Sequence, residues 1–266
     1  MIQHPKKGTK MTPTEIVLAA MTAIFTDFDA DAAALLLTDN YIQHNPGVPT
    51  GAAPVLGLVP TLKDMGIAID THRMIAEGDL VVLHSTYTNA QIFGAETMIA
   101  FDVFRVEDGK VAEHWDNLIP IAAPNPSGRT QTDGATQITD LDQTAANKAT
   151  VQAFISDVLQ GGAPEKITDY VSTETYLQHN PAVADGLDGL GAALAAMAEA
   201  GQSMRYDTTH LVVAEGNFVF AGSEGAMGDT PTAFYDLFRL ENGKIVEHWD
   251  VISQIPAEAA NDNGKF

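Results

Sequence analysis

The sequence predicts an α+β protein built from two tandem copies of one domain. The stretch FDVFRVEDGKVAEHWD, residues 101–116, returns as YDLFRLENGKIVEHWD, residues 235–250, with ten of the sixteen positions identical. Each copy is a β-branched and aromatic run interrupted by Asp-Gly or Asn-Gly, the pattern of a β-hairpin. Apolar residues at helical spacing precede both hairpins. Helices followed by an antiparallel sheet are therefore expected twice.

In the first half, Thr12, Pro13 and Glu15 have the residue types of an N-cap, a first helical position and a capping box. A later helix is expected despite Pro54 and Pro60, which disfavour one. Helices are predicted near residues 12–28, 30–37 and 52–65, and strands near 67–77, 80–87, 97–106 and 111–116. Between the second and third helices lies YIQHNPGVPTG, in which Asn-Pro and Gly predict a loop.

The second half repeats this order after a linker at residues 120–142 that is rich in Pro, Gly, Ser and Thr. YLQHNPAVADG, residues 176–186, matches the loop of the first half. Helices are predicted near residues 143–159 and 187–200, and strands near 204–215, 218–224, 232–240 and 245–250. We therefore divide the chain into domains at 1–130 and 131–266.

Composition excludes several classes of function. The 266 residues include 35 acidic and 14 basic side chains, a net charge of −21, which disfavours nucleic acid and anionic membranes as partners. Cysteine is absent, so no disulfide, thiol nucleophile or thiolate metal site is expected. The start, MIQHPKKGTKM, has no apolar core like that of a signal peptide, and no apolar run approaches the roughly 18 residues of a membrane span. A cytoplasmic location is expected.

Ionisable groups recur inside the strands. Asp102 and Asp116 lie in apolar strands, where a carboxylate is costly without a partner, and Asp236 and Asp250 repeat them. Six of the eight histidines form pairs between the copies: His44 with His179, His72 with His210, and His114 with His248. The second copy has Gly222 where His84 stands, with Glu224 two residues on as a partial substitute. Histidines beside carboxylates suit proton transfer near neutral pH.

The order of elements, the YIQHNP and YLQHNP loops and the two EHWD hairpins resemble the SnoaL-like branch of the nuclear transport factor 2-like superfamily, over nearly the whole chain. They look like the group named predicted SnoaL-like, aldol-condensation-catalysing proteins. The resemblance implies two cone-shaped NTF2-like domains, each a curved antiparallel sheet wrapped by about three helices around an apolar pocket. In the polyketide cyclases of this branch, an acidic residue is the general acid/base and a second polar group lies fourteen residues earlier. Asp116 and Asp102 match this spacing, as do Asp250 and Asp236.

Such sheets tend to bury their exposed face against a partner, so we expect the two halves to pack sheet against sheet as a pseudo-dimer. A further homo-oligomer is left open. We also expect Asp102 and Asp116 to titrate as a coupled pair in which at least one pKa is raised.

Two functions from different classes fit these residues. The first is a cofactor-free acid/base enzyme acting on a small or medium apolar carbonyl compound, of polyketide cyclase, aldol-condensation or isomerase type. It needs a base for the proton next to the carbonyl and a donor for the enolate. The alternative is a non-catalytic binding module for a hydrophobic small molecule. A passive apolar pocket gains little from two buried carboxylates, which favours the enzyme.

The candidate catalytic residues are Asp116, Asp102, His84, His72, His114, His44, Asp250, Asp236, His210 and His248. The candidate substrate-binding residues are Tyr41, Trp115, Phe104, His179 and Glu224. The histidine of each HNP loop can equally well fix its loop by bonding to the backbone, and Trp115 can serve as a packing residue.

No cofactor or metal is expected. Two histidines and a carboxylate can form a facial triad for a metal, but HxxxH and HxH spacings are absent from the sequence. Because the second copy lacks a counterpart of His84, the first copy is expected to hold the better-equipped site.

Overall fold

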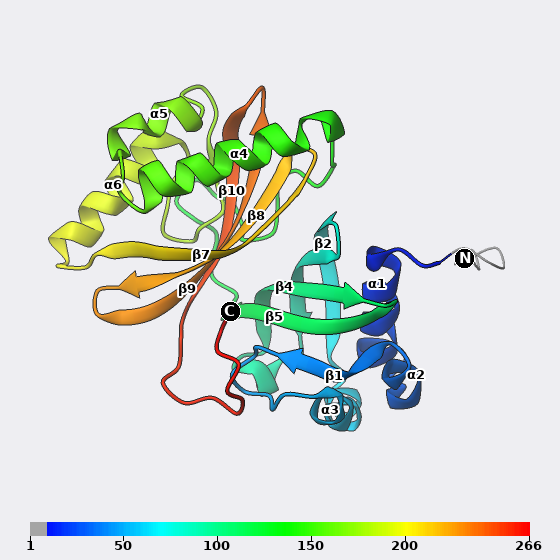
Figure 1. Ribbon diagram of the computed structural model, residues 1–266. Helices are drawn as coiled ribbons and strands as arrows, with labels where there is room; N and C mark the ends of the chain where they lie inside the picture. The colour runs from blue at the N-terminus through cyan, green and yellow to red at the C-terminus, as the bar shows by residue number, and fades with distance from the viewer. Residues whose placement is uncertain (1–9) are drawn as a thin grey trace.

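The computed structural model describes residues 10–266 and contains two domains of the same architecture (Figure 1). Within these residues, ten strands form two five-stranded sheets in the orders β1-β5-β4-β3-β2 and β6-β10-β9-β8-β7. The strands are β1 (Leu37–Gln43), β2 (Ala68–Glu77), β3 (Leu80–Thr88), β4 (Thr97–Glu107), β5 (Lys110–Pro120), β6 (Leu177–Gln178), β7 (Met204–Glu215), β8 (Phe218–Met227), β9 (Thr230–Glu241) and β10 (Lys244–Gln254).

The helices and short turns lie before or between the strands. They are α1 (Pro13–Phe25), α2 (Ala30–Ala34), α3 (Ala52–Met65), η1 (Gln91–Phe93), η2 (Leu141–Gln143), α4 (Thr144–Phe154), the π-helical turn η3 (Ile155–Leu159), η4 (Pro164–Lys166), α5 (Ile167–Tyr170) and α6 (Gly186–Glu199). Along the part of the chain that the structure covers, none of the helices is both long and apolar enough to cross a membrane. The expectation of no signal peptide rests on residues 1–9, which lie outside the described residues.

The predicted helix starts are confirmed. The Thr12 side chain accepts from the Glu15 backbone N–H, and the Glu15 carboxylate accepts from the Thr12 N–H at 2.8 Å, which completes the capping box before α1. Pro60 lies inside α3, which nevertheless continues to Gly66 as its left-handed C-cap. In the second domain the predicted long helix is divided into α4 and η3, and η4 with α5 follows where no helix was expected.

Both hairpin turns form as predicted. Asp108 and Gly109 have φ of 50° and 80°, and Asn242 and Gly243 have 50° and 74°. Positive φ at both central residues is the geometry of a type I′ turn, which fits the twist of the flanking strands.

The expectation of a purely antiparallel sheet is wrong at one edge of each domain. β1 runs from the end of a predicted helix into the start of a predicted loop. It pairs in parallel with β5, so that Gln43 lies opposite His114. β6 pairs with β10 in the same way, with Gln178 opposite His248. The last strand of each hairpin leaves an edge of unpaired N–H and C=O groups, and these short strands satisfy part of it.

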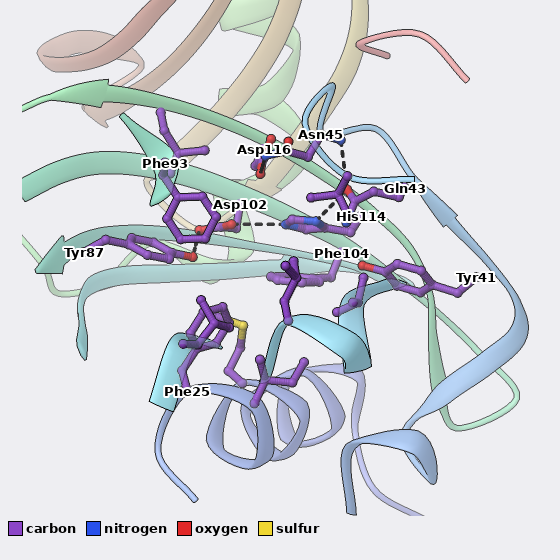
Figure 2. A pocket seen from close by; sticks show the side chains of 17 residues that line it. Phe25, Tyr41, Gln43, Asn45, Tyr87, Phe93, Asp102, Phe104, His114 and Asp116 are labelled. Carbon is purple, nitrogen blue, oxygen red and sulfur yellow. Dashed lines mark hydrogen bonds and ion pairs between the residues drawn. The ribbon is translucent and has the colours of Figure 1, made fainter. Parts of the chain in front are cut away.

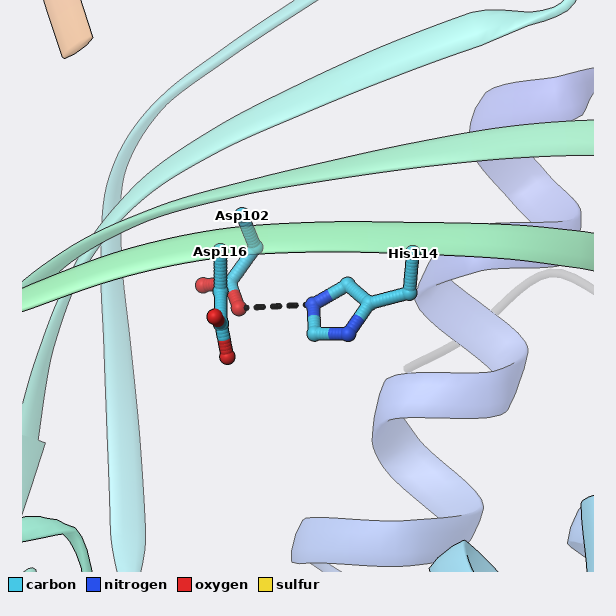
Figure 3. Close-up of side chains that lie close together, drawn as sticks. All are labelled: Asp102, His114 and Asp116. Carbon is cyan, nitrogen blue, oxygen red and sulfur yellow. Dashed lines mark hydrogen bonds and ion pairs between the residues drawn. The ribbon is translucent and has the colours of Figure 1, made fainter. Parts of the chain in front are cut away.

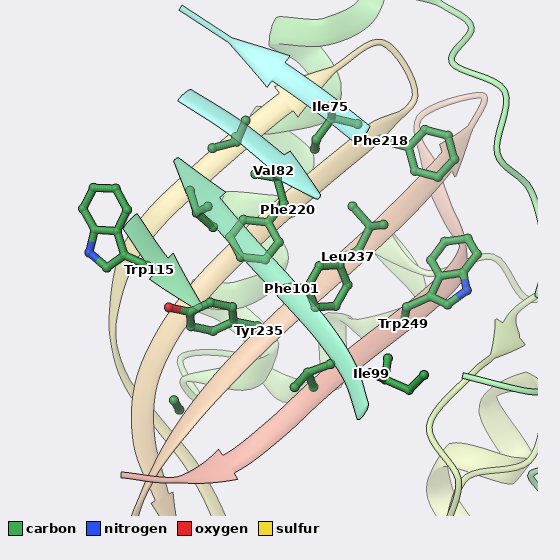
Figure 4. Packing of buried hydrophobic residues seen from close by; sticks show 14 residues of the cluster. Ile75, Val82, Ile99, Phe101, Trp115, Phe218, Phe220, Tyr235, Leu237 and Trp249 are labelled. Atoms are coloured by element: carbon green, nitrogen blue, oxygen red, sulfur yellow. The ribbon is translucent and has the colours of Figure 1, made fainter. Parts of the chain in front are cut away.

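The two sheets pack face to face, which confirms the expected pseudo-dimer. Figure 4 shows the buried cluster between them, with Phe101, Trp115 and Ile75 from the first sheet against Phe220 and Tyr235 from the second. The Phe101 and Phe220 ring centroids are 5.5 Å apart, and those of Phe220 and Tyr235 are 5.4 Å apart. A strand therefore presents one face to this cluster and the other to the helices of its own domain.

After its last strand, each domain sends a segment across to the other domain. We call residues 121–139 the crossing segment and residues 255–266 the return segment. Asn125 donates to the carbonyl of Gln178 at 2.6 Å. Asn261 donates to the carbonyl of Asn45 at 2.8 Å, so the return segment is fixed to the HNP loop of the first domain (Figure 1, red). The boundary predicted between residues 130 and 131 lies inside the crossing segment.

Phe220→Ala tests how far the domains depend on this interface. Phe220 is fully buried between the sheets, so its truncation leaves a cavity and should lower the free energy of unfolding by about 3–5 kcal/mol. Chemical denaturation followed by circular dichroism measures the change. Leu141→Ala, at a residue that is 67% exposed, is the control and should change it by less than about 0.5 kcal/mol. A loss below about 1 kcal/mol for Phe220→Ala would contradict the interface as a main source of stability.

Candidate active site

A cavity lies in the first domain between the sheet and helices α1 and α3 (Figure 2). Its empty volume is about 620 Å³, including the space at its mouth. Most of the lining is apolar and comes from the two helices, β4 and β5. The polar lining is concentrated on the sheet side and consists of Tyr41, Gln43, Asn45, Tyr87, Asp102, His114 and Asp116. Such an apolar cavity with few converging polar groups is typical of a small-molecule site.

Three of the predicted residues form the polar end of this cavity. Asp102 of β4 and Asp116 of β5 are directly opposite each other in the antiparallel register, and both are buried. His114 is two residues before Asp116 and therefore shares its face of the sheet. The His114 Nε2 lies 3.1 Å from the Asp102 Oδ1 (Figure 3). The hairpin register alone thus brings two carboxylates and an imidazole together.

The side chain of Gln43 fixes the tautomer of His114. The backbone N–H of Asn45 donates to the Gln43 Oε1 at 2.9 Å, which identifies that atom as an acceptor. The His114 Nδ1 lies 3.1 Å from the same oxygen and must therefore be the donor. A hydrogen bond between His114 Nε2 and Asp102 then requires one further proton, carried by either partner.

Burial dominates the electrostatics of Asp102. It raises the pKa of the carboxyl group above its ordinary value, although the hydrogen bond and positive charge of His114 oppose the shift. The negative charge of Asp116 raises the pKa further, and the hydroxyl of Tyr87, which donates at 2.9 Å, lowers it. The raised pKa agrees with the expectation for a coupled pair.

Asp116 has a different environment. Its Oδ2 accepts from the Asn45 amide at 2.5 Å. Its Oδ1 is buried and accepts no hydrogen bond from any residue in the described range 10–266. A buried carboxylate oxygen without a hydrogen bond is costly, and this one belongs to a residue that lines the cavity.

The second domain repeats the arrangement around a larger cavity of about 1260 Å³. The His248 Nε2 lies 2.9 Å from the Asp236 Oδ1, and the Asn180 amide donates to the Asp250 Oδ2 at 2.8 Å. Burial raises the pKa of Asp250. Burial lowers the pKa of His248, but the hydrogen bond to Asp236 and the charges of Asp250 and Asp236 outweigh it, so the pKa is raised.

The structure corrects the predicted site at His72, His84 and His210. In the register of β3 with β4, Leu83 is opposite Asp102, so His84 points to the other face of the sheet. There it stacks on Phe101 at 4.4 Å, inside the interface between the domains. His72 lies in a bulge of β2 and binds the Thr86 hydroxyl at 2.8 Å.

His210 binds Glu224 at 3.0 Å near the surface of the second domain. Neither residue is among those that line the second cavity, so Glu224 does not act there as a partial substitute for His84. With His84 outside the cavity, the reason for expecting a better-equipped first site is lost.

The histidines of the HNP loops also lie on the interface face. His44 contacts Glu113 at 2.9 Å and the carbonyl of Gly264 at 3.1 Å, and stacks on Trp115. His179 likewise contacts Glu247 at 3.0 Å and the carbonyl of Thr130 at 2.8 Å. These imidazole rings bind each HNP loop to the backbone of the return or crossing segment. This agrees with the alternative that each histidine fixes its loop by bonding to the backbone.

Of the predicted substrate-binding residues, the structure places Tyr41 and Phe104 in the first cavity. Trp115 instead packs in the cluster between the sheets, as its alternative interpretation expected. The participation of Tyr41 and Phe104 in binding stays a prediction.

Sequence reasoning missed four polar residues around the first site: Gln43, Asn45, Tyr87 and Lys265. The first two recur as Gln178 and Asn180 in the repeated loops, so the repeat offered a signal for them. The repeat gives no such signal for Tyr87. In the second domain the hydroxyl that donates to Asp236, at 3.2 Å, belongs to Tyr206, which lies on a different strand of its sheet.

The Asp–His–Asp group of each cavity is also a candidate metal site. Asp102, His114 and Asp116 offer ligand atoms that all lie within 4.8 Å of one another, as do Asp236, His248 and Asp250. One nitrogen and two carboxylate oxygens suit a divalent transition metal. However, the histidine Nε2 is already bonded to a carboxylate in both groups, so metal binding would replace that bond.

Two α+β domains of one architecture, each with an apolar cavity that ends in buried ionisable groups, are typical of a protein with a small-molecule catalytic or binding role. The chain belongs to the SnoaL-like domain family, whose model matches residues 18–114 and 151–248. A comparison with curated proteins found no match.

Several solved structures are similar to one domain of this chain. TsrD from Streptomyces laurentii is 20% identical over 40% of this chain and 87% of its own, with a TM-score of 0.34. IdmH from Streptomyces antibioticus is 19% identical over 41% and 92%, with a TM-score of 0.35. An LEH-like epoxide hydrolase from M. tuberculosis is 20% identical over 40% and 82%, with a TM-score of 0.34.

Tyr87→Phe should raise the pKa of Asp102 further, because the lost hydroxyl donates to the charged form of the carboxylate. Titration of the Asp carboxyl carbons by NMR measures it. Since the folded pKa exceeds that of an unfolded Asp, this group favours folding increasingly as pH falls through the folded value. Tyr41→Phe, at the other phenol in the cavity, is the control. An unchanged or lower Asp102 pKa in Tyr87→Phe would contradict the assignment.

Proposed function

We propose that the chain is a cofactor-free acid/base enzyme that acts on a small or medium apolar carbonyl compound. The reaction is of polyketide cyclase, aldol-condensation or isomerase type. The observation that carries the proposal is a buried carboxylate oxygen of Asp116, without a hydrogen-bond partner among the described residues, beside the hydrogen-bonded pair of His114 and Asp102.

Asp116 is the base in this proposal. Its Oδ1 takes the proton from the carbon next to the substrate carbonyl. The C–H electron pair forms a C=C bond, and the C=O π pair moves to the oxygen to give an enolate. The Asn45 amide holds the other oxygen of Asp116 and so orients the carboxylate. The apolar lining of the cavity excludes water from the reacting atoms.

The His114–Asp102 pair is the proton donor. Its one shared proton passes to the enolate or to the product, and Tyr87 and Gln43 hold the pair in place. Two carboxylates that face each other resist simultaneous ionisation, which favours a state with one base and one acid. Asp102 is the acid of this pair, and His114 holds it in place through Nε2.

The same cavities fit the alternative of a binding module for a hydrophobic molecule. Burial of two carboxylates and a histidine at the end of an apolar cavity is costly, and simple retention of such a ligand does not need them. Their presence in both domains therefore favours the enzyme, and the following experiment separates the two.

The double variant Asp116→Asn/Asp250→Asn should lose catalysed proton exchange. In D₂O, the wild-type protein is expected to speed deuterium incorporation next to the carbonyl of 2-tetralone, followed by NMR. Removal of both bases should reduce the catalysed rate by about 10²-fold or more. Each single variant retains the exchange of the other domain.

Glu113→Gln is the matched control. Glu113 lies on the same strand as Asp116 but faces away from the cavity, where it binds His44 and Arg105. Exchange should be unaffected by this change. Wild-type exchange in the double variant would refute the acid/base proposal, whereas binding of 2-tetralone without exchange by the wild type would favour the binding module.

Removal of metal ions should leave the exchange unchanged. The histidine and carboxylates of each group bond to one another and supply the base and acid without a metal in this proposal. Exchange is measured before and after dialysis against EDTA. A loss that one divalent ion restores would overturn the cofactor-free mechanism and support a metal at Asp102, His114 and Asp116.

A further inference from the structure

An outer cavity that is partly built by the second domain adjoins the first cavity. The outer cavity has an empty volume of about 1310 Å³, including open space, and shares Asn45, Phe93 and Asp116 with the inner one. Its other wall comes from the end of β10 and from the return segment, which contributes Lys265. Asp116 therefore lies at the junction of the two cavities.

The return segment is held firmly at this place. Asn261 donates to the carbonyls of Asn45 and Val48 at 2.8 and 2.9 Å. Asn263 donates to the carbonyl of Gln43 at 2.8 Å. The return segment is therefore hydrogen-bonded to the HNP loop, whose side chains orient His114 and Asp116. The end of the described chain lies beside β5 in Figure 1.

The side chain of Lys265 is only 7% exposed, and within the described residues it has hydrogen-bonding capacity to spare. Its ammonium donates to the backbone carbonyl of Asp116 at 2.5 Å and lies 3.7 Å from the Asp116 Oδ1, beyond direct hydrogen-bond distance. An ammonium has three N–H donors, and one is accounted for. Burial lowers the pKa of Lys265, and the charge of Asp116 opposes this shift. Among the described residues that line the inner, outer and second-domain cavities, Lys265 is the only Lys or Arg.

We propose that Lys265, supplied by the return segment of the second domain, is a catalytic residue of the first site and binds the enolate oxygen of the substrate. This proposal rests on the proposed function, which names a base but leaves the enolate without a cationic partner. The carbon that loses its proton and the carbonyl oxygen are two bonds apart. A base and a donor separated by 3.7 Å can contact both at once.

The charge balance during the reaction supports this role. Before proton transfer, the negative charge is on Asp116 and its partner cation is Lys265. After transfer, Asp116 is neutral and the charge is on the enolate, which then takes the free N–H donors of Lys265. No buried charge is left without a partner at either stage, and donors fixed in advance stabilise the developing charge.

Among the residues from 10 to 266, no such cation lines the second cavity. The carbonyl of Thr130 contacts His179 as that of Gly264 contacts His44, and the residue after Thr130 is the neutral Gln131. Gln131 accepts from the backbone of Ala122 at 2.7 Å. Arg129 of the same segment pairs with Asp185 instead. The two sites thus share a base and an acid but differ in the partner for the enolate.

Lys265→Met tests the proposal with 4-nitrophenol, whose phenolate mimics an enolate and absorbs visibly. The ratio of phenolate to neutral phenol bound by the protein should fall about tenfold in Lys265→Met, since a charge-assisted hydrogen bond is lost. Lys265→Arg keeps the charge and should retain most of the phenolate. Arg129→Met removes a cation from the crossing segment and should leave the ratio unchanged. Equal ratios in the wild type and Lys265→Met would overturn the proposal.

Proton exchange of 2-tetralone gives a second readout. In the Asp250→Asn background, where the first site alone is equipped with a base, Lys265→Met should reduce exchange by about 10²-fold. Full exchange in that variant overturns the role of Lys265 and leaves the proposed function intact. Asp116→Asn should abolish first-site exchange and yet preserve phenolate binding, because it removes a negative charge beside Lys265. A loss of phenolate in Asp116→Asn would contradict a direct contact with Lys265.

Discussion

The register of the β4–β5 hairpin determines both the site and the association of the domains. With Asp108-Gly109 at the turn, Asp102 pairs with Asp116, and both point into the first cavity. Their neighbours Phe101 and Trp115 must then point to the opposite face, where the second sheet packs. A shift of one residue would send the carboxylates into the interface and the aromatic rings into the cavity.

This local control explains what the sequence could predict. The hairpin, its turn and the grouping of Asp102, Asp116 and His114 depend on alternation within one continuous stretch. The face of His84 depends on how β3 pairs with β4 across the residues between them, and alternation in one strand does not give that register. The parallel pairing of β1 and the docking of Lys265 join residues far apart in sequence, so they too required the structure.

The repeat fixes the chemistry of the two cavities more strongly than their shape. Both hairpins supply the same His and Asp groups. However, the hydroxyl that donates to Asp102 is that of Tyr87 on β3, whereas the hydroxyl that donates to Asp236 is that of Tyr206 on β7. The helix that covers the second cavity is rich in alanine, whereas α3 covers the first with Val55, Leu58 and Leu62. Small side chains such as Ala193 and Ala196, beside Leu190, Leu194 and Met197 of the same helix, leave more space, which agrees with the larger second cavity.

The two domains also complete each other chemically. The crossing and return segments each bind the HNP loop of the other domain, through Asn125 and Asn261. Those loops carry the Gln side chain that orients the histidine of each site and the Asn side chain that orients Asp116 or Asp250. The positions of these catalytic groups therefore depend on contact with the other half of the chain. Tandem fusion keeps the two halves together at any protein concentration, and it permits one segment to carry Lys265 and the other a neutral residue. A dimer of identical single domains would have to place the same residue in both sites, so the fusion is what allows the two sites to differ.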